Sequence, residues 1–155
     1  MGLDKLEWRP ASGGDVPKDA MHAGVDGGEK VYVARAHHEG CIIPGKLHKT
    51  HSHVYIPYNM KEVPVPDYEV LCGPKACLSW VEGSGSDIPV NAVPGGQEAD
   101  GEVLYIGRVI HEGTVTVGKI HPSHGSCYVA YGGDELAFAD YEILVKNKLG
   151  QILDV

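Results

Sequence analysis

The sequence lacks several features that mark common protein classes. It has one phenylalanine and no run that approaches the roughly 20 apolar residues of a membrane helix, so we expect no membrane insertion. Basic residues are the minority, with 13 Lys and Arg against 21 Asp and Glu. The formal net charge of −8, with no basic stretch to offset it, predicts that DNA and RNA are repelled. We therefore expect neither a membrane protein nor a nucleic-acid-binding protein.

Catalytic motifs are missing as well. The sequence contains no Gly-rich phosphate loop, no Gly-x-Ser-x-Gly elbow and no His-Glu-x-x-His zinc motif. His38 and Glu39 together with Lys46 would suit acid–base chemistry. That group recurs later in the chain, however, and duplication in a short chain is more typical of binding sites than of catalytic centres. We expect a protein that is not an enzyme and that needs no cofactor.

The N-terminus has no apolar run of the kind found in a secretory signal. We therefore expect a cytoplasmic protein, whose release from the cell would follow a non-classical route. The four cysteines are expected to be reduced thiols in that compartment. A disulfide between Cys72 and Cys77 stays open as an alternative, because a turn at Gly73-Pro74 would bring these two together.

Glycine and proline are abundant, with 21 and 10 residues. This composition favours many short strands joined by tight turns, and no window shows helical periodicity over 11 or more residues. The sequence therefore predicts an all-β protein. Strands rich in β-forming residues are expected over 30–37, 54–56 and 68–71, and again over 102–111, 128–130 and 141–145.

The chain repeats itself at an offset of 73 residues. All eight tyrosines pair at this offset, and Gly45-Lys46 falls on Gly118-Lys119. Trp8 and Trp80 pair at 72, which places a one-residue insertion near 99–101. We divide the chain into repeat 1 (1–73) and repeat 2 (74–155, with a short C-terminal tail). One repeat of about 75 residues would form only a marginal hydrophobic core by itself. We therefore expect two pseudo-symmetric antiparallel β units packed as one compact body.

Each repeat carries a carboxylate and a lysine, both expected in turns. These are Asp26 and Lys46 in repeat 1 and Glu98 and Lys119 in repeat 2. A carboxylate accepts hydrogen bonds and an ammonium only donates them, so the pair suits the hydroxyls of a neutral polyol. The spacing alone favours a plainer interpretation, a surface salt bridge worth about 0–1 kcal/mol.

The repeats resemble the DM-nine repeat family. The family pattern is a Trp, a Gly followed by an acid, a Tyr-x-x-Arg strand, a Gly-Lys and a closing Tyr-Glu-x-Leu. Both repeats contain nearly all of this pattern. Two-repeat members include molluscan lectins that bind mannose in the innate recognition of microbes. The resemblance implies a homodimeric, agglutinating lectin for mannose or mannose-rich glycans. It also implies ligand contacts from Asp26, Lys46, Glu98 and Lys119, with backbone contacts from Gly24, Val25, Gly96 and Gln97.

Repeat 2 departs from the pattern, since Glu98 stands for an aspartate and Val117 for a proline. The longer side chain of glutamate moves the carboxylate outward by about one C–C bond, so the site of repeat 2 is expected to differ from that of repeat 1. The alternative to a lectin is a non-catalytic protein-interaction module in which the acid–lysine pairs are surface salt bridges.

Nine histidines raise the question of a metal site. His51 and His53 would share one face of a strand, but Ser126 replaces the second of them in repeat 2. Since zinc needs three or four ligands, we expect no metal site and sugar binding that is independent of calcium. His38 and His111 are interpreted as turn or ligand-rim residues, and Trp8 and Trp80 as core anchors.

Overall fold

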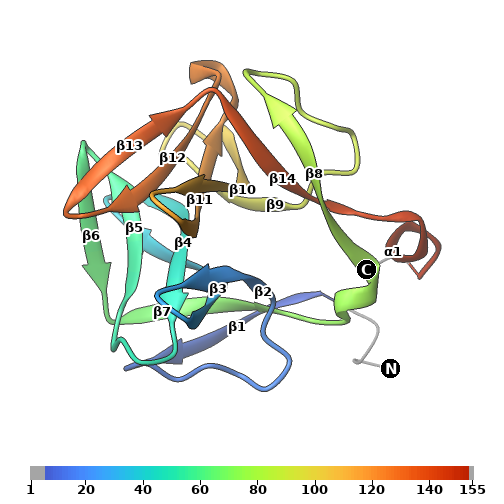
Figure 1. Ribbon diagram of the computed structural model, residues 1–155. Helices are drawn as coiled ribbons and strands as arrows, with labels where there is room; N and C mark the ends of the chain where they lie inside the picture. The colour runs from blue at the N-terminus through green and yellow to red at the C-terminus, as the bar shows by residue number, and fades with distance from the viewer. Residues whose placement is uncertain (1–5, 154–155) are drawn as a thin grey trace.

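The computed structural model describes residues 6–153 as a nearly all-β molecule (Figure 1). Each repeat contributes seven strands. In repeat 1 they are β1 (Glu7–Ser12), β2 (His22–Asp26), β3 (Glu29–His38), β4 (Cys41–His48), β5 (Val54–Tyr58), β6 (Lys61–Val65) and β7 (Asp67–Cys72). In repeat 2 they are β8 (Leu78–Ser84), β9 (Pro94–Gln97), β10 (Val103–His111), β11 (Thr114–His121), β12 (Ser126–Tyr131), β13 (Asp134–Phe138) and β14 (Asp140–Lys146). Short 3₁₀ turns η2 (Lys75–Cys77) and η3 (Pro122–His124) and a final helix α1 (Lys148–Leu153) complete the chain.

The strands form one antiparallel sheet whose order is symmetric about its middle. The path runs β1-β7-β3-β4-β5-β6-β13-β12-β11-β10-β14-β8, with β2 beside β3 and β9 beside β10 and β4. Each strand of repeat 1 thus has a counterpart at the same distance from the β6–β13 junction (Figure 1). The expected all-β, pseudo-symmetric architecture is confirmed.

All six expected strands are present, within two residues at each end. Their burial follows the two-residue period of a strand: Leu104 and Ile106 on β10 are buried, whereas Tyr105 between them is partly exposed. The strands not expected from sequence are short or interrupted. β9 reads Pro-Gly-Gly-Gln, and β4 contains Pro44 and Gly45, which weaken strand propensity and remove a backbone donor. Local propensity misses such strands because pairing with neighbours stabilises them.

Three apolar clusters fill the interior. One lies in repeat 1 around Ile43 and Ile56, and one in repeat 2 around Ile120 and Ile143. The third is built by both repeats, and includes Val33 and Leu71 of the first and Ile106 and Leu144 of the second. Trp8 and Trp80 pack against this shared cluster, as expected of core anchors. Because this core belongs to neither repeat alone, the two pack as one body.

The last strand is followed by the six-residue helix α1, which the sequence did not predict. Neither α1 nor any other helix within residues 6–153 is long and apolar enough to cross a membrane. Cys41, Cys72, Cys77 and Cys127 are all buried free thiols, so Cys72 and Cys77 form no disulfide.

Candidate functional site

The lysine of each Gly-Lys motif lies inside a strand. Lys46 on β4 and Lys119 on β11 are each only 5% exposed. The expectation that they lie in turns is wrong. The preceding glycines explain the local structure: a Cβ on Gly45 would stand 2.3 Å from the carbonyl oxygen of Tyr55, and one on Gly118 would stand 2.0 Å from that of Tyr128. The glycine lets the next strand approach closely.

Each buried lysine is neutralised by a glutamate from its own repeat. Lys46 Nζ lies 3.4 Å from Glu62 Oε2, and Lys119 Nζ lies 3.5 Å from Glu135 Oε2. The other repeat holds these glutamates in place: the Gly133 N–H donates to Glu62 Oε1 at 3.0 Å, and the Met60 N–H donates to Glu135 Oε1 at 2.9 Å. An ammonium has three donors, so each ion pair leaves the lysine with donors to offer.

An aromatic ring from the opposite repeat faces each lysine. Lys46 Nζ lies 5.3 Å from the ring centre of Tyr131, and Lys119 Nζ lies 5.6 Å from that of Tyr58. These distances are within the range of a cation–π interaction. The pKa of Tyr131 is raised by a hydrogen bond with Glu112, by burial and by the charge of Asp26.

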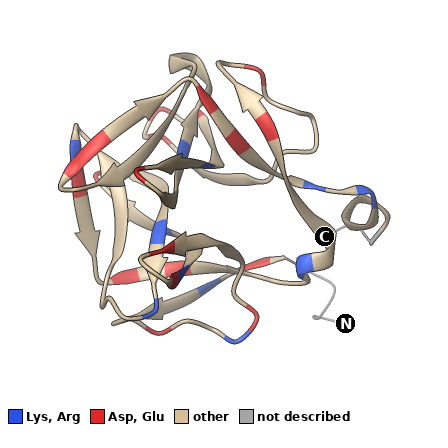
Figure 2. Cartoon of the chain, viewed as in Figure 1, with Lys and Arg blue, Asp and Glu red and all other residues tan. Residues whose placement is uncertain are grey.

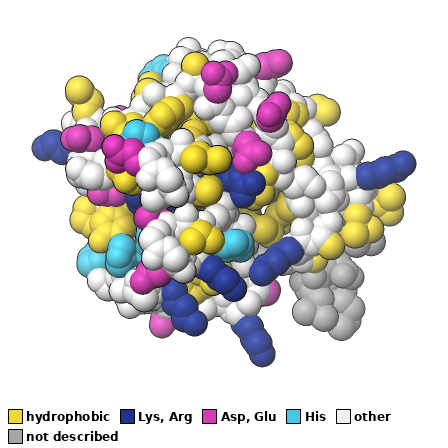
Figure 3. All heavy atoms as spheres, viewed as in Figure 1, with side chains coloured by type: hydrophobic (Ala, Val, Ile, Leu, Met, Phe, Trp, Pro, Cys, Tyr) yellow, Lys and Arg dark blue, Asp and Glu magenta, His cyan; other side chains and the backbone are white. Residues whose placement is uncertain are grey.

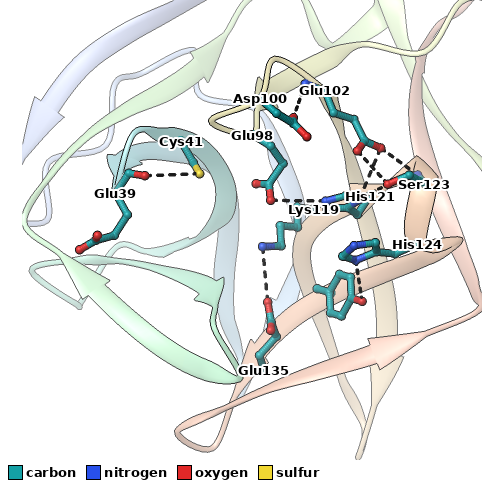
Figure 4. A network of polar contacts seen from close by, with 11 residues as sticks. Glu39, Cys41, Glu98, Asp100, Glu102, Lys119, His121, Ser123, His124 and Glu135 are labelled. Carbon is teal, nitrogen blue, oxygen red and sulfur yellow. Dashed lines mark hydrogen bonds and ion pairs between the residues drawn. The ribbon is translucent and has the colours of Figure 1, made fainter.

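The same relation holds in the second copy, where the pKa of Tyr58 is raised mainly by burial and also by the charge of Glu98. In each copy, therefore, a lysine faces a tyrosine of the other repeat, and the charge of the acid acts on the same tyrosine. We call Asp26, Lys46, Glu62 and Tyr131 site 1, and Glu98, Lys119, Glu135 and Tyr58 site 2. Figure 4 shows the surroundings of site 2, where the Lys119 side chain lies between the side chains of Glu98 and Glu135.

A buried histidine holds each acid. His48 Nε2 lies 3.2 Å from Asp26 Oδ2, and His121 Nε2 lies 3.4 Å from Glu98 Oε1 (Figure 4). Burial lowers the pKa of His48, and the neighbouring His51 lowers it further, against the opposing effect of Asp26. The ring is therefore neutral at pH 7, and its Nε2 lies against one oxygen of the Asp26 carboxylate.

A second carboxylate and a second imidazole support each histidine. His121 Nδ1 lies 3.4 Å from Glu102, whose pKa is lowered by hydrogen bonds from the Ser123 backbone and hydroxyl (Figure 4). His124 stacks on His121 with ring centres 3.6 Å apart. In repeat 1, Glu29 Oε2 lies 3.9 Å from His48 Nδ1, and His51 stacks on His48 with ring centres 4.4 Å apart.

Arginines of the Tyr-x-x-Arg motif cross between repeats to position the strands that carry the acids. Arg108 pairs with Glu142 at 2.8 Å and donates to the carbonyl of Ala23 on β2 at 2.8 Å. Arg35 pairs with Glu69 at 2.8 Å and donates to the carbonyl of Gly95 on β9 at 3.2 Å. Each guanidinium also stacks on the tryptophan of its own repeat.

The expected backbone contacts of Gly24, Val25, Gly96 and Gln97 remain a prediction. The structure gives the two glycines a packing role: a Cβ on Gly24 would stand 2.4 Å from the Val115 side chain, and one on Gly96 would stand 2.0 Å from the Ile42 carbonyl oxygen. In both cases the neighbour belongs to the other repeat. Val25 and Gln97 are exposed beside the acids.

The sequence did not predict the ion-pair partners correctly. Within residues 6–153 the lysines pair with Glu62 and Glu135, and the acids contact histidines, so the alternative of acid–lysine surface salt bridges is wrong in its geometry. The site residues that were not predicted could have been found from the sequence, because they recur between the repeats. His48 with His121, Glu62 with Glu135, Tyr58 with Tyr131 and Glu29 with Glu102 are all kept at the 73-residue offset.

The histidines do not assemble a metal centre. Within residues 6–153 no group of three or more His, Cys, Asp or Glu side chains is placed to hold a metal ion. His53 hydrogen-bonds Ser52 instead, and His51 stacks on His48. The polar groups of the sites are thus arranged for hydrogen bonding. Glu98 Oε2 is buried and has no hydrogen-bond partner among the described residues, so it is an acceptor for a further donor.

The DM9 repeat model matches residues 3–65 and 26–138. The chain belongs to the DM9 repeat family. Its members are in general non-catalytic binding domains. The chain is also 38% identical over 69 residues to Natterin-3 of Thalassophryne nattereri, a match that covers 44% of this chain and 17% of that protein.

Among solved structures, the nematode sperm cell motility protein MFP2B is similar in fold, with a TM-score of 0.64 at 14% identity. The similarity covers 93% of this chain and 47% of MFP2B, so the chain spans about half the length of that protein. At this identity the likeness shows the fold alone. Together, the family match and the symmetric sheet identify the chain as a two-repeat DM9 module.

Proposed function

We propose that this DM9 module binds mannose or mannose-bearing glycans at site 1 and site 2. The observation that carries the proposal is the buried lysine of each site, which keeps donors available beyond its single glutamate partner and faces a tyrosine of the other repeat. A neutral sugar presents hydroxyls that both donate and accept. An ammonium and a carboxylate in one site match that chemistry.

The rigidity of each site supports the same ligand class. The acid is held by a histidine, the lysine by a glutamate, and the glutamate by a backbone N–H of the other repeat. Polar groups that are fixed before binding lose little conformational freedom when a ligand arrives. The tyrosine ring adds an apolar wall beside these groups, as small-molecule sites require.

Titration calorimetry with mannose tests the proposal. The wild-type chain should bind two sugars, each near the millimolar affinity, about −4 kcal/mol, that is expected of a small polar ligand. Lys46→Met should abolish one site and Lys119→Met the other, and the double variant should not bind. Lys49→Met, which removes an exposed lysine next to β4, is the matched control and should keep both sites.

A second titration tests whether each site is shared between repeats. In the Lys119→Met background only site 1 is left, so Tyr131→Leu should weaken the remaining binding although the tyrosine lies in repeat 2. Tyr105→Leu, a change of a partly exposed tyrosine of the same repeat outside both sites, should not. Unchanged binding in Tyr131→Leu would show that the tyrosine is not part of the site.

We also propose that the chain forms a homodimer and acts in the recognition of mannose-coated microbes. A closed two-fold dimer is the commonest assembly and would present four sites. Linked sites raise avidity by about 10²–10⁴ without new contacts. Light scattering should give the mass of a dimer, and mannan-coated particles should agglutinate until free mannose is added. A monomer that does not agglutinate particles would remove this part of the proposal.

A further inference from the structure

A groove on repeat 2 lies outside both sites. It encloses about 970 Å³ between β8, β14, β10 and the start of β11. Its floor is apolar and includes Val109, Phe138 and Ile110, and the Ile110 side chain is 76% exposed. A volume near 1,000 Å³ is at the upper end of ligand pockets, and an exposed large apolar side chain inside one marks a surface that gains from being covered.

The rim of the groove is acidic. Glu82, Asp87, Asp140 and Glu142 line it, with Arg108 as the only basic residue among its lining. Figure 2 shows the acidic segments of β8 and β14 side by side, and Figure 3 shows carboxylates spread over that part of the surface with apolar side chains between them. Arg108 is already engaged by Glu142 and by the Ala23 carbonyl. The rim thus presents an excess of negative charge to the groove.

Two of these carboxylates stand directly opposite each other. In the register of β8 and β14, Glu82 pairs with Glu142. Like charges directly opposite on neighbouring strands destabilise a sheet. In repeat 1 the equivalent pair is Pro10 and Glu69, which carries no repulsion. Because Arg108 already pairs with Glu142, Glu82 is the carboxylate of this pair for which no ion pair is found within residues 6–153, and a cation in the groove would pair with it.

The apolar floor is also particular to repeat 2. Ile110 stands where repeat 1 has the exposed His37, and Phe138 stands where it has Val65. Gly83 lets β8 lie close to the ring of Tyr141, because a Cβ there would stand 2.8 Å from Tyr141 Cε1, whereas repeat 1 has Ala11 opposite its own Tyr68. Repeat 2 thus has more apolar surface than repeat 1 at Ile110 and Phe138, and one additional carboxylate, Glu82, lines the same groove.

We propose that this groove binds a basic, apolar peptide segment of a partner protein. Lysine or arginine side chains of the segment would pair with Glu82, Asp87 and Asp140, and its apolar side chains would cover Ile110 and Phe138. The segment would bind independently of mannose, because no residue that lines the groove belongs to site 1 or site 2.

Fluorescence anisotropy on the full chain tests the proposal with three short labelled peptides of equal length. They alternate lysine with leucine, lysine with serine, and glutamate with leucine. The lysine–leucine peptide should bind, and its affinity should fall several-fold as the salt concentration rises, because rim charges are screened. The lysine–serine peptide should bind at least five-fold more weakly, and the glutamate–leucine peptide should not bind. Equal binding of all three peptides, or no binding of the first, would overturn the proposal.

Variants place the peptide in the groove. The double change Glu82→Gln with Asp140→Asn should weaken binding of the lysine–leucine peptide at least five-fold, and so should Ile110→Ser alone. The matched changes in repeat 1, Asp67→Asn and His37→Ser, should leave the affinity unchanged. Circular dichroism should show the same fold in all four. Unchanged affinity in both groove variants, or displacement of the peptide by mannose, would contradict the assignment.

Discussion

The two repeats build their sites from the same framework but differ in the acid and in its surroundings. Lys46 and Lys119 are equally buried, and their glutamate partners lie at 3.4 and 3.5 Å. The acids differ in length, and Cys41 stands near Glu98 where the other site has Thr114. Burial raises the pKa of the Cys41 thiol, so it is neutral beside Glu98. The comparison shows that the lysine side of the site is fixed, whereas the acid side tolerates variation.

The largest effect is expected from the glycines that precede the acids. Gly96→Ala would push a Cβ against the backbone oxygen of Ile42, which cannot move without shifting β4, whereas Gly24→Ala meets only the side chain of Val115. Overpacking costs about 1–3 kcal/mol, so we expect about 3 kcal/mol of lost unfolding free energy for Gly96→Ala and about 2 kcal/mol for Gly24→Ala. Urea unfolding measures both.

The repair variant sharpens this comparison. Val115→Ala should recover part of the stability that Gly24→Ala loses, because it removes the atoms that the new Cβ meets. Ile42→Ala should not rescue Gly96→Ala, since the 2.0 Å contact is with the backbone. Rescue of both double variants would mean that the two repeats pack in the same way here.

The next effect concerns the acids themselves. Asp26→Ala removes an acceptor from site 1, and Glu98→Ala removes one from site 2. A hydrogen bond to a charged group contributes about 1.5–3 kcal/mol, so each affected site should lose roughly 10- to 100-fold in mannose affinity. Calorimetry should report half the stoichiometry in each variant. If the wild-type chain and Glu98→Ala both bind one sugar and agglutinate alike, repeat 2 is a structural copy and only repeat 1 binds sugar.

A smaller effect is expected from pH. The lowered pKa of His48 means that the unfolded chain takes up a proton, near the ordinary pKa of about 6.5, before the folded chain does. Stability should therefore fall as pH decreases below about 6.5, until the lowered folded pKa is passed. Partly buried His22, whose pKa is also lowered by desolvation, adds to this slope.

His48→Gln should reduce the loss of stability between pH 7.5 and 5.5 without removing it. The exposed His37→Gln is the control and should retain the wild-type slope. Urea unfolding at the two pH values measures the difference. An identical slope in wild type and His48→Gln would contradict the assignment.

The smallest effect is expected from chelation. Sugar binding should be unchanged in EDTA at both sites, because each offers only two carboxylates, one of them paired with a lysine, and not the six to eight oxygen ligands of calcium. Calorimetry with mannose, with and without EDTA, makes the measurement. Loss of binding in EDTA that calcium restores would require a different mechanism.

The sequence alone determined the duplication, the all-β class, the packing as one body and the family, because these follow from residues that recur at a fixed offset. It also named one acid and one lysine for each repeat. Even the groove on repeat 2 follows from positions where the copies differ, such as Ile110 and His37.

Only the tertiary structure decided how those residues meet. The sequence did not show that Lys46 is buried in a strand, since Pro44 and Gly45 weaken strand propensity and only pairing with β3 and β5 overrides it. Nor did it show that the tyrosine beside each lysine comes from the other repeat. That contact depends on β6 and β13 joining at the middle of the sheet, a long-range pairing that no local pattern encodes.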